Sequence, residues 1–205
     1  IAGPEFDSVN SQTSVLYLID RASGERTTLV PSGKWSFGHL GWLNDNQLAV
    51  TATDYQTWGS SENAKLYTID IASGAMTLLN GEDLSWGSSV GSDAKLYGGR
   101  GWKIVNGEIW TLLTWDNHSE LTVFDRQGQR RALTTEEGSV DFFDVQNGRI
   151  VMSAMRKMRL QELYELKDGV EIQLTHVNDA VLAESYVAQP EKVSFTNDGV
   201  RIDGW

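Results

Sequence analysis

The sequence predicts an all-β protein, a partial β-propeller of about three four-stranded blades preceded by an additional hairpin. One short sequence pattern returns four times along the chain. The segments between the repeats hold pairs of short apolar strands joined by turn signals. The composition agrees, because 8 Trp, 20 Gly and only 3 Pro among 205 residues are typical of an aromatic, turn-rich β protein.

The repeated pattern is clearest in its first two copies. Leu16-Tyr17-Leu18-Ile19-Asp20 with Ser23-Gly24 returns as Leu66-Tyr67-Thr68-Ile69-Asp70 with Ser73-Gly74. Weaker copies begin at Leu121 and Leu163, and the spacings between the starts are 50, 55 and 42 residues. Such a period, built of short strands, is typical of propeller blades. Each copy leads into a short final strand, predicted at Leu29-Val30, Leu78-Leu79, Leu133-Thr134 and Leu174-Thr175.

Each full blade is predicted to contain four strands, A to D, with the repeated pattern as strand C. Strands A and B precede it, within residues 40–52, 102–113 and 140–152. Asn-Gly pairs at 106–107 and 147–148 join two of these strand pairs. Asn-Gly is a strong hairpin signal, because a type I′ turn needs positive φ at both central residues. Several inner strands are apolar on both faces, which suits a blade packed between two neighbours.

Two segments also carry helical signals. Residues 155–166 have apolar residues near helical spacing, but the repeat places Leu163–Leu166 on strand C, and we predict a strand there. Residues 178–186 are either a short capped helix or a loop before Pro190.

The propeller is predicted over residues 14–176, beginning with the C–D hairpin at 14–30. Residues 1–13 are assigned to a leader, in which Gly3-Pro4-Glu5-Phe6 is either a remnant of a cleaved tag or native sequence. Because a closed propeller needs at least about four blades, we predict a piece of a larger protein. An open arc leaves strand edges unpaired, so we also expect the chain to self-associate.

The C-terminal residues resemble a known junction. Leu174-Thr175-His176-Val177-Asn178 is followed by Pro190-Glu191-Lys192-Val193-Ser194-Phe195 and Asp198-Gly199-Val200-Arg201-Ile202-Asp203-Gly204-Trp205. This stretch resembles the site at which the propeller of a prolyl oligopeptidase-family serine peptidase passes into its α/β-hydrolase domain. The blade repeats resemble the acylaminoacyl-peptidase branch of that family. The resemblance covers most of the chain, and its terminal motif is more specific than the repeats.

The resemblance implies a two-domain hydrolase that cleaves short or N-acylated peptides with a Ser-Asp-His triad in the second domain. It implies that residues 177–205 are the junction and the first strands of that domain, and that the propeller gates substrate entry. No triad position can be assigned within this chain, so we predict no catalytic, cofactor or metal residue and no activity of this chain alone. The implied partners are the hydrolase domain and short peptides. The alternative is a standalone binding propeller without enzymatic activity.

Charge and composition exclude several other classes. A net charge of −11 disfavours binding to nucleic acid or to an anionic membrane surface. No apolar run reaches the roughly 20 residues that a spanning helix needs. The absence of Cys excludes disulfides and thiolate zinc sites, and together with the lack of a signal peptide it favours a cytoplasmic location.

Three motifs could suggest chemistry. Gly87-Ser88-Ser89-Val90-Gly91 matches G-x-S-x-G, but a nucleophile elbow needs an apolar strand before it and a helix after it, so Ser89 is predicted to lie in a loop or strand A. Asp116-Asn117-His118 is predicted to be a hairpin loop rather than a metal site, and His176 a turn residue. His39 is the remaining histidine, and no zinc set is predicted.

The only basic cluster is Arg156-Lys157-Met158-Arg159, between strands B and C of the last blade. A solvated loop is the default expectation, and contact with the hydrolase domain or an anionic substrate end is the alternative. The tryptophans could form a stacking surface for sugars or peptides. We instead predict that Trp42, Trp102 and Trp110 pack between blades and that Trp58 and Trp115 are exposed.

Overall fold

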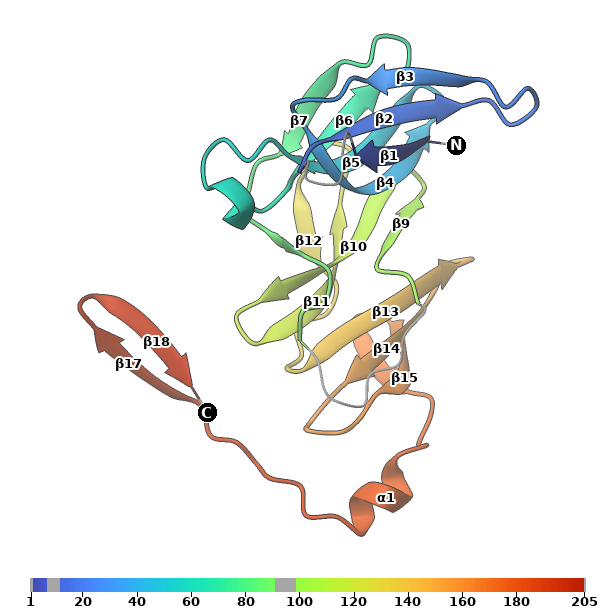
Figure 1. Ribbon diagram of the computed structural model, residues 1–205. Coiled ribbons are helices and arrows are strands. Elements are labelled where there is room, and N and C mark those ends of the chain that lie inside the picture. Colours follow the sequence, from blue (N-terminus) through green and yellow to red (C-terminus); the bar gives the residue numbers. More distant parts are fainter. Residues whose placement is uncertain (1, 7–11, 91–98, 205) are drawn as a thin grey trace.

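The computed structural model describes residues 2–6, 12–90 and 99–204. Four antiparallel sheets follow one another along the chain, and a two-stranded hairpin lies after them (Figure 1). Consecutive sheets pack face to face, so the molecule is an arc of a β-propeller. The prediction of an all-β partial propeller is confirmed.

The first sheet has one strand more than the sequence predicted. It runs in the order β1 (Ala2–Phe6), β2 (Ser14–Ile19) and β3 (Arg26–Val30). β2 and β3 form the expected hairpin, and β1 pairs antiparallel with β2. Residues 2–6, assigned to the leader, therefore continue this sheet.

The second sheet is a four-stranded meander of the predicted kind. Its strands are β4 (Ser36–Asn44), β5 (Gln47–Thr53), β6 (Lys65–Asp70) and β7 (Met76–Asn80), hydrogen-bonded in chain order. A short 3₁₀ turn, η1 (Gly59–Ser61), lies in the long connection between β5 and β6.

The third sheet divides its inner position between two short strands. β8 (Ser85–Trp86) and β9 (Trp102–Val105) both pair with β10 (Glu108–Trp115), at opposite ends of it. β11 (His118–Phe124) and β12 (Arg130–Ala132) complete the sheet. The sequence predicted β9 as strand A and did not predict β8.

The fourth sheet contains β13 (Ser139–Gln146), β14 (Arg149–Met155), β15 (Glu162–Lys167) and β16 (Val170–Gln173). The strand expected at 163–166 is confirmed as β15, although the segment also carries a helical pattern.

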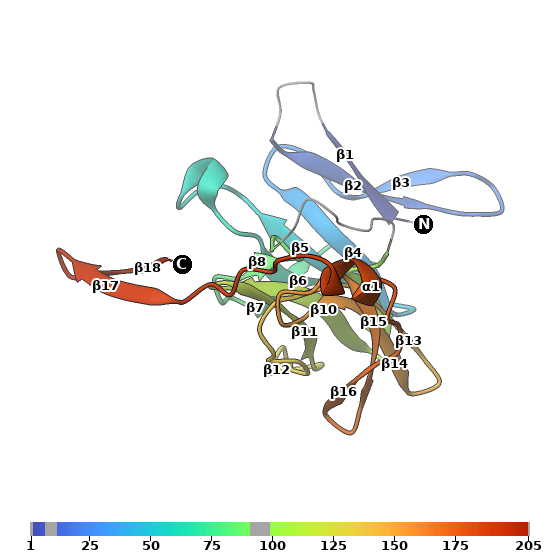
Figure 2. The ribbon, with the colours of Figure 1, turned by 90° about the horizontal axis from the view of Figure 1, so that it is seen from below.

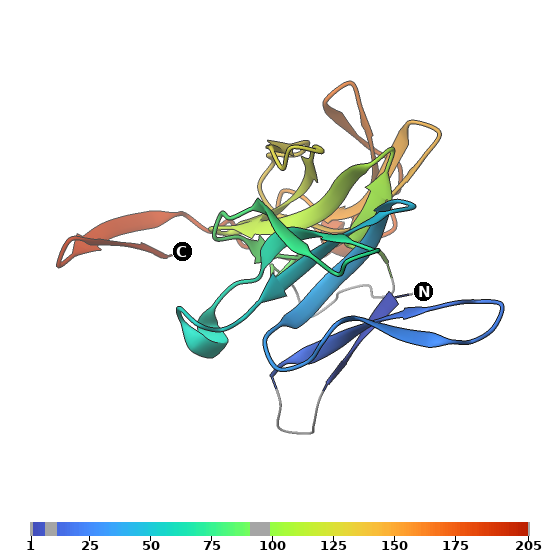
Figure 3. The same ribbon diagram turned by 90° about the horizontal axis from the view of Figure 1, so that it is seen from above.

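After the fourth sheet come the helix α1 (Asp179–Ala183) and the hairpin of β17 (Val193–Asn197) and β18 (Val200–Gly204). The helix decides the question that the sequence left open at 178–186. The hairpin lies apart from the four sheets in all three views (Figures 1, 2 and 3).

The repeated Asp-x-x-Ser-Gly element is turn chemistry. The Asp20 carboxylate accepts hydrogen bonds from the Ser23 N–H at 2.7 Å and the Ser23 hydroxyl at 3.0 Å. Asp70 and Ser73 repeat this arrangement, at 2.9 and 2.6 Å. These bonds hold the pKa of both carboxyls below the ordinary value. The pattern therefore recurs because each blade turns from strand C to strand D in the same way.

The final strands of the third and fourth sheets end earlier than predicted. Leu133-Thr134 and Leu174-Thr175 lie just beyond β12 and β16. The Thr134 hydroxyl accepts the N–H of Leu121 at 2.9 Å, and the Thr175 hydroxyl accepts the N–H of Leu163 at 2.9 Å. A side chain therefore replaces the next backbone partner in both blades, and the regular pairing stops.

Three apolar cores lie between the four sheets. The first joins Leu16 and Val30 to residues of the second sheet, and the next joins Leu66 to Ile109 and other residues of the third. The last joins the third sheet to the fourth. Its buried residues are Trp110, Leu112, Leu121, Val123, Val140, Phe143, Val145, Met152, Ala154 and Tyr164. The strands with two apolar faces thus lie between two neighbours, as predicted.

Candidate functional site

The sheets share one end at which the chain leaves the last of them. In the fourth sheet this end holds the pairs Ser139↔Met155 and Ala154↔Glu162. The N–H of Leu174 bonds to the Leu163 carbonyl at the same end. We call this end of the four sheets the exit face. Its connections are residues 54–64, 116–117, 133–138, 156–161 and 174–178.

A buried carboxylate links the third and fourth sheets at the exit face. Asp141 is 3% exposed. It accepts hydrogen bonds from the hydroxyls of Ser88 and Ser139, each at 2.9 Å, and from the side-chain amide of Gln161 at 2.6 Å. The Ser88 and Ser119 hydroxyls are also hydrogen-bonded, at 2.9 Å. A buried charge is tolerated when it is bonded in this way, and here it ties four strand ends together.

The G-x-S-x-G match does not form a nucleophile elbow in the described part of the chain. The strand before it, β8, has two residues. Ser89 is exposed, and both its N–H and its hydroxyl donate to the Thr114 hydroxyl at 3.0 Å. Gly91, which ends the match, lies outside the described residues. The structure therefore places Ser89 in a loop.

The basic cluster is not a solvated loop throughout, which corrects the default expectation. Arg156 is 6% exposed and pairs with Glu171 through two hydrogen bonds, at 2.7 and 2.9 Å. It also donates to the carbonyl of Ser139 at 2.9 Å. Lys157 and Met158 are exposed and both have positive φ. A tight turn thus presents these two residues to solvent while Arg156 is held inside the sheet end.

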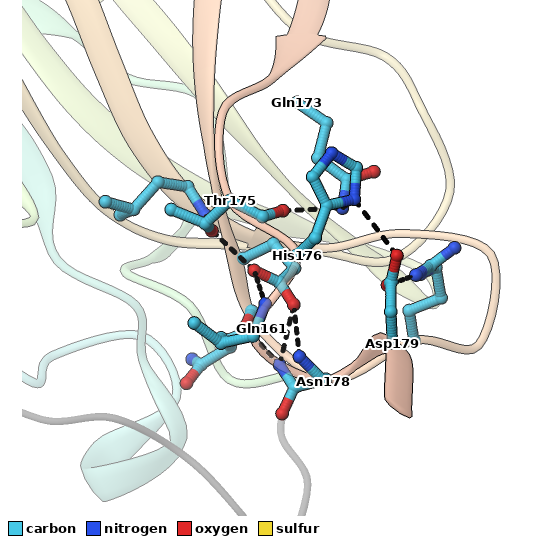
Figure 4. A network of polar contacts seen from close by, with 10 residues as sticks. Gln161, Gln173, Thr175, His176, Asn178 and Asp179 are labelled. Atoms are coloured by element: carbon cyan, nitrogen blue, oxygen red, sulfur yellow. Dashed lines mark hydrogen bonds and ion pairs between the residues drawn. The ribbon is translucent and has the colours of Figure 1, made fainter. Parts of the chain in front are cut away.

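A second buried carboxylate holds the segment that leaves the fourth sheet. Glu162, the first residue of β15, is 2% exposed. It accepts a hydrogen bond from the Thr175 hydroxyl and from the N–H groups of Val177 at 3.2 Å and Asn178 at 2.8 Å. The side-chain amide of Asn178 donates to it as well, at 3.0 Å. Figure 4 shows Thr175 and Asn178 converging on this carboxylate. We call Glu162 with Thr175, Val177 and Asn178 the exit clamp.

Opposing effects act on the pKa of Glu162. Burial works to raise the pKa, but the hydrogen bonds from Thr175, Asn178 and Val177 together outweigh it and hold the pKa below its ordinary value. Glu162 is therefore an anion at neutral pH, and the charged form makes the contacts of the clamp.

Ion pairs extend the clamp to the helix α1. Arg159 pairs with Asp179, the first residue of α1 (Figure 4). His176 contacts the other oxygen of Asp179 at 3.1 Å and the Gln173 amide at 3.3 Å. Asn178 precedes the helix but does not cap it with its side chain. Its amide instead donates to the Gln161 carbonyl at 2.8 Å, so the helix start is fixed by the blade.

The other two histidines lie elsewhere. His118 follows the turn after β10 and is 3.9 Å from the Glu120 carboxylate. His39 stacks on Trp102, with ring centroids 5.2 Å apart and planes at 6°, and burial lowers its pKa. Across residues 2–6, 12–90 and 99–204, no group of three or more His, Cys, Asp or Glu side chains could hold a metal ion.

The tryptophan predictions are confirmed in part. Trp110 is buried, and Trp102 packs edge-on against Trp86 between the second and third sheets, at 6.1 Å. Trp58 is 74% exposed, as predicted. Trp42 is 42% exposed, contrary to the prediction, because it lies near the turn end of β4, beyond the reach of the first sheet's core. Trp115 is half-buried rather than exposed, because the Arg130 guanidinium covers its ring at 4.6 Å.

The exposed Trp58 belongs to an ordered loop of the exit face. The Glu62 carboxylate accepts the N–H groups of Thr57 at 2.9 Å and Trp58 at 3.3 Å. Asn63 donates to Asp83 at 2.9 Å, which ties the loop to the next connection. The backbone of this loop is therefore fixed while the indole points into solvent.

Two shallow grooves lie at the opposite end of the sheets, each of 320 Å³. The residues lining the first are Leu18, Ile19, Asp20, Arg21, Glu25, Thr27 and Trp42. The second is lined by Glu108, Val123, Asp125, Gln129, Arg130 and Arg131. Neither groove contains a histidine or a serine. The exit face, with its buried carboxylates and fixed loops, is the better-organised surface.

Sequence reasoning missed Asp141 and Glu162, the two anchors of the exit face. Each is the only acidic residue at its strand start, and single acidic residues are too common in sequences to indicate a buried site. A repeat-aware signal did exist, because Ser139, Asp141, Gln161 and Glu162 place polar residues where the equivalent strands begin.

No protein-family model and no curated protein matches the sequence. Among solved structures, the acylaminoacyl peptidase of Pyrococcus horikoshii is similar over 100% of this chain, with a TM-score of 0.73 and 20% identity. The match covers 30% of that peptidase chain, so this chain spans less than a third of its length.

Two further structures match less of this chain. The β-propeller domain of the Trilobed protease from Pyrococcus furiosus is similar over 87% of this chain and 51% of its own, with a TM-score of 0.61 and 20% identity. TolB from Acinetobacter baumannii is similar over 86% of this chain and 41% of its own, with a TM-score of 0.57 and 12% identity. These similarities show the fold, a portion of a β-propeller.

No helix in the described ranges has the length and apolarity required to cross a membrane.

Proposed function

We propose that this chain is the substrate-gating propeller portion of a prolyl oligopeptidase-family serine peptidase that hydrolyses short or N-acylated peptides. The coverage of the matches carries the proposal. The acylaminoacyl peptidase matches all of this chain, whereas the isolated propeller domain and TolB leave 13–14% unmatched. That share is similar in size to the segment that follows β16. The hairpin β17–β18 is then the first strand pair of an α/β-hydrolase domain.

The exit face supports the proposal in a second way. The chain leaves the fourth sheet through the exit clamp, and a domain that follows β18 would be tethered at this face. The face carries an ordered loop with an exposed Trp58 and the exposed turn Lys157-Met158. Aromatic side chains on fixed loops are typical anchors of protein interfaces. The propeller would thus cover the active site and limit the size of entering peptides, and its lack of cysteine suits a cytoplasmic location.

The alternative is a standalone binding propeller. The match to TolB favours it, because the blades alone produce that similarity. It gives no role to the hairpin β17–β18, whose apolar residues Val193 and Phe195 are 57% and 56% exposed. An apolar hairpin without a covering partner is expected to belong to a larger unit.

The test is hydrolysis by the protein encoded by the whole gene. We expect it to cleave anilides of N-acetylated amino acids or short peptides. We also expect a strand-embedded G-x-S-x-G after residue 205, whose Ser→Ala variant abolishes turnover. A whole-gene protein without such a serine, and without turnover, would contradict the proposal and leave the binding propeller.

A further inference from the structure

The fourth sheet presents an apolar face to solvent. Leu163 of β15 is 42% exposed, and beside it on β16 lie Val170, Ile172 and Leu174, which are 60%, 43% and 40% exposed. The pairing of Glu165 with Ile172 places these four residues on one side of the sheet, because alternate residues of a strand share a face. Tyr164 and Leu166 point the other way, toward the third sheet. We call Leu163, Val170, Ile172 and Leu174 the end face.

The repeat shows what normally covers this face. Leu163 occupies the first position of the repeated pattern, as do Leu16, Leu66 and Leu121 in the preceding sheets. Each of those three leucines is 0% exposed and lies in the core shared with the next sheet along the chain. Only the fourth sheet has no such neighbour among the described residues. The end face is therefore shaped to pack against another propeller sheet.

The first sheet presents the matching surface. Ile69, at the fourth position of the pattern in the second sheet, is 0% exposed because it packs in the core shared with the preceding sheet. Tyr67 packs against the same core. Their equivalents in the first sheet, Tyr17 and Ile19, are only half-buried. We call Tyr17 and Ile19 the start face.

We propose that the end face of this chain binds the start face of a second copy, so that two copies close one ring head to tail. Each copy supplies four sheets, and the eight blades of such a ring lie within the range of about four to eight that is typical of propellers. Each junction would repeat the packing already present three times within the chain. The net charge of −11 opposes association, but at physiological ionic strength this repulsion is screened beyond about 8 Å.

The proposal concerns this chain as a separate polypeptide and does not rest on the proposed function. Sedimentation equilibrium at tens of micromolar tests it, together with three variants checked for a native circular dichroism spectrum. The double variant Leu163→Lys/Ile172→Lys places charges on the end face, and Ile19→Lys does so on the start face. Leu78→Lys is the matched control, because Leu78 is 53% exposed on the second sheet, which has neighbours on both sides.

We expect twice the mass of one chain for the wild type and for Leu78→Lys, and the mass of one chain for both face variants. A monodisperse wild-type monomer would overturn the proposal, as would a double variant that stays dimeric. A dimeric Ile19→Lys beside a monomeric double variant would mean that two end faces pair with each other, which overturns the head-to-tail ring. Larger assemblies of the wild type would overturn the closed ring of two copies.

Discussion

The Ser88 hydroxyl donates a hydrogen bond to the Asp141 carboxylate at 2.9 Å, across 53 residues of sequence. Ser88 follows the short strand β8 of the third sheet, and Asp141 lies at the start of β13 in the fourth. This contact crosses from one blade to the next, so it fixes the third connection of the exit face relative to the fourth sheet.

Replacing Ser88 should therefore destabilise the fold. A hydrogen bond to a buried charge contributes about 1.5–3 kcal/mol, and Ser88→Ala leaves Asp141 with one donor fewer. We expect the free energy of unfolding, measured by urea denaturation, to fall by about that amount. Ser89→Ala is the control, since Ser89 is exposed, and it should change the stability by less than about 0.5 kcal/mol. Equal effects of the two variants would show that the Asp141 network does not stabilise the sheet junction.

The buried pair of Arg156 and Glu171 gives a second prediction. Arg156→Met leaves Glu171 as an uncompensated charge, and we expect a loss of about 3–5 kcal/mol in the free energy of unfolding. The double variant Arg156→Met/Glu171→Leu should recover most of this loss, because it removes both charges. Arg149→Met breaks the exposed pair with Glu165 and should cost no more than about 1 kcal/mol. A single variant as stable as the wild type would contradict the buried position of Arg156.

The exit clamp predicts a specific pH dependence. The pKa of Glu162 is lower in the folded chain than in the unfolded chain. Its contribution to stability is therefore fully present above the ordinary Glu pKa and is lost as the pH falls through the lower, folded-state pKa. We expect the difference in unfolding free energy between wild type and Glu162→Gln to be constant near neutral pH and to shrink in acid. Urea midpoints of both proteins from pH 7 down to the acid limit of folding measure it. A difference that grows on acidification would contradict the anionic clamp.

Amide exchange provides a local readout of the same clamp. The N–H groups of Val177 and Asn178 bond to Glu162, so both should exchange slowly in the wild type. In Glu162→Ala they should exchange at the rate of an open loop, while amides within β14 stay protected. Unchanged protection of residues 177 and 178 in this variant would show that Glu162 does not hold the exit segment.

This chain alone should have no peptidase activity. The Ser89 hydroxyl donates to Thr114, and Ser88 donates to Asp141, so neither serine has a base positioned to activate it. We expect no hydrolysis of acylated amino-acid esters or peptide anilides by the isolated polypeptide. Turnover that disappears in Ser89→Ala would prove this wrong.

The blades could be predicted from the sequence because local chemistry defines them. The Asp-x-x-Ser-Gly turns bond within four residues, and Asn106-Gly107 and Asn147-Gly148 adopt the positive φ that their hairpins require. Strand ends were less predictable, since Thr134 and Thr175 end their strands through side-chain hydrogen bonds that no propensity describes. The exit face could not be predicted, because Asp141 and Glu162 gain their partners only when segments 15–53 residues apart come together.

Exposure of individual tryptophans depended on similar detail. Trp42 and Trp110 both lie in strands, and the same pattern predicted burial for both. Trp110 reaches the core between the third and fourth sheets, whereas Trp42 lies at a strand end with a register shift beside it. The strand pattern gives the face to which a side chain points, but not how far the neighbouring sheet extends over it.

Size selectivity of the whole-gene protein tests the gating role most directly. The measurement is kcat/KM for a short N-acylated peptide anilide and for the same scissile residues placed within a peptide several times longer. A propeller that covers the active site predicts efficient hydrolysis of the short substrate and little or none of the long one. Equal kcat/KM values for the two substrates would contradict a gating role for these blades.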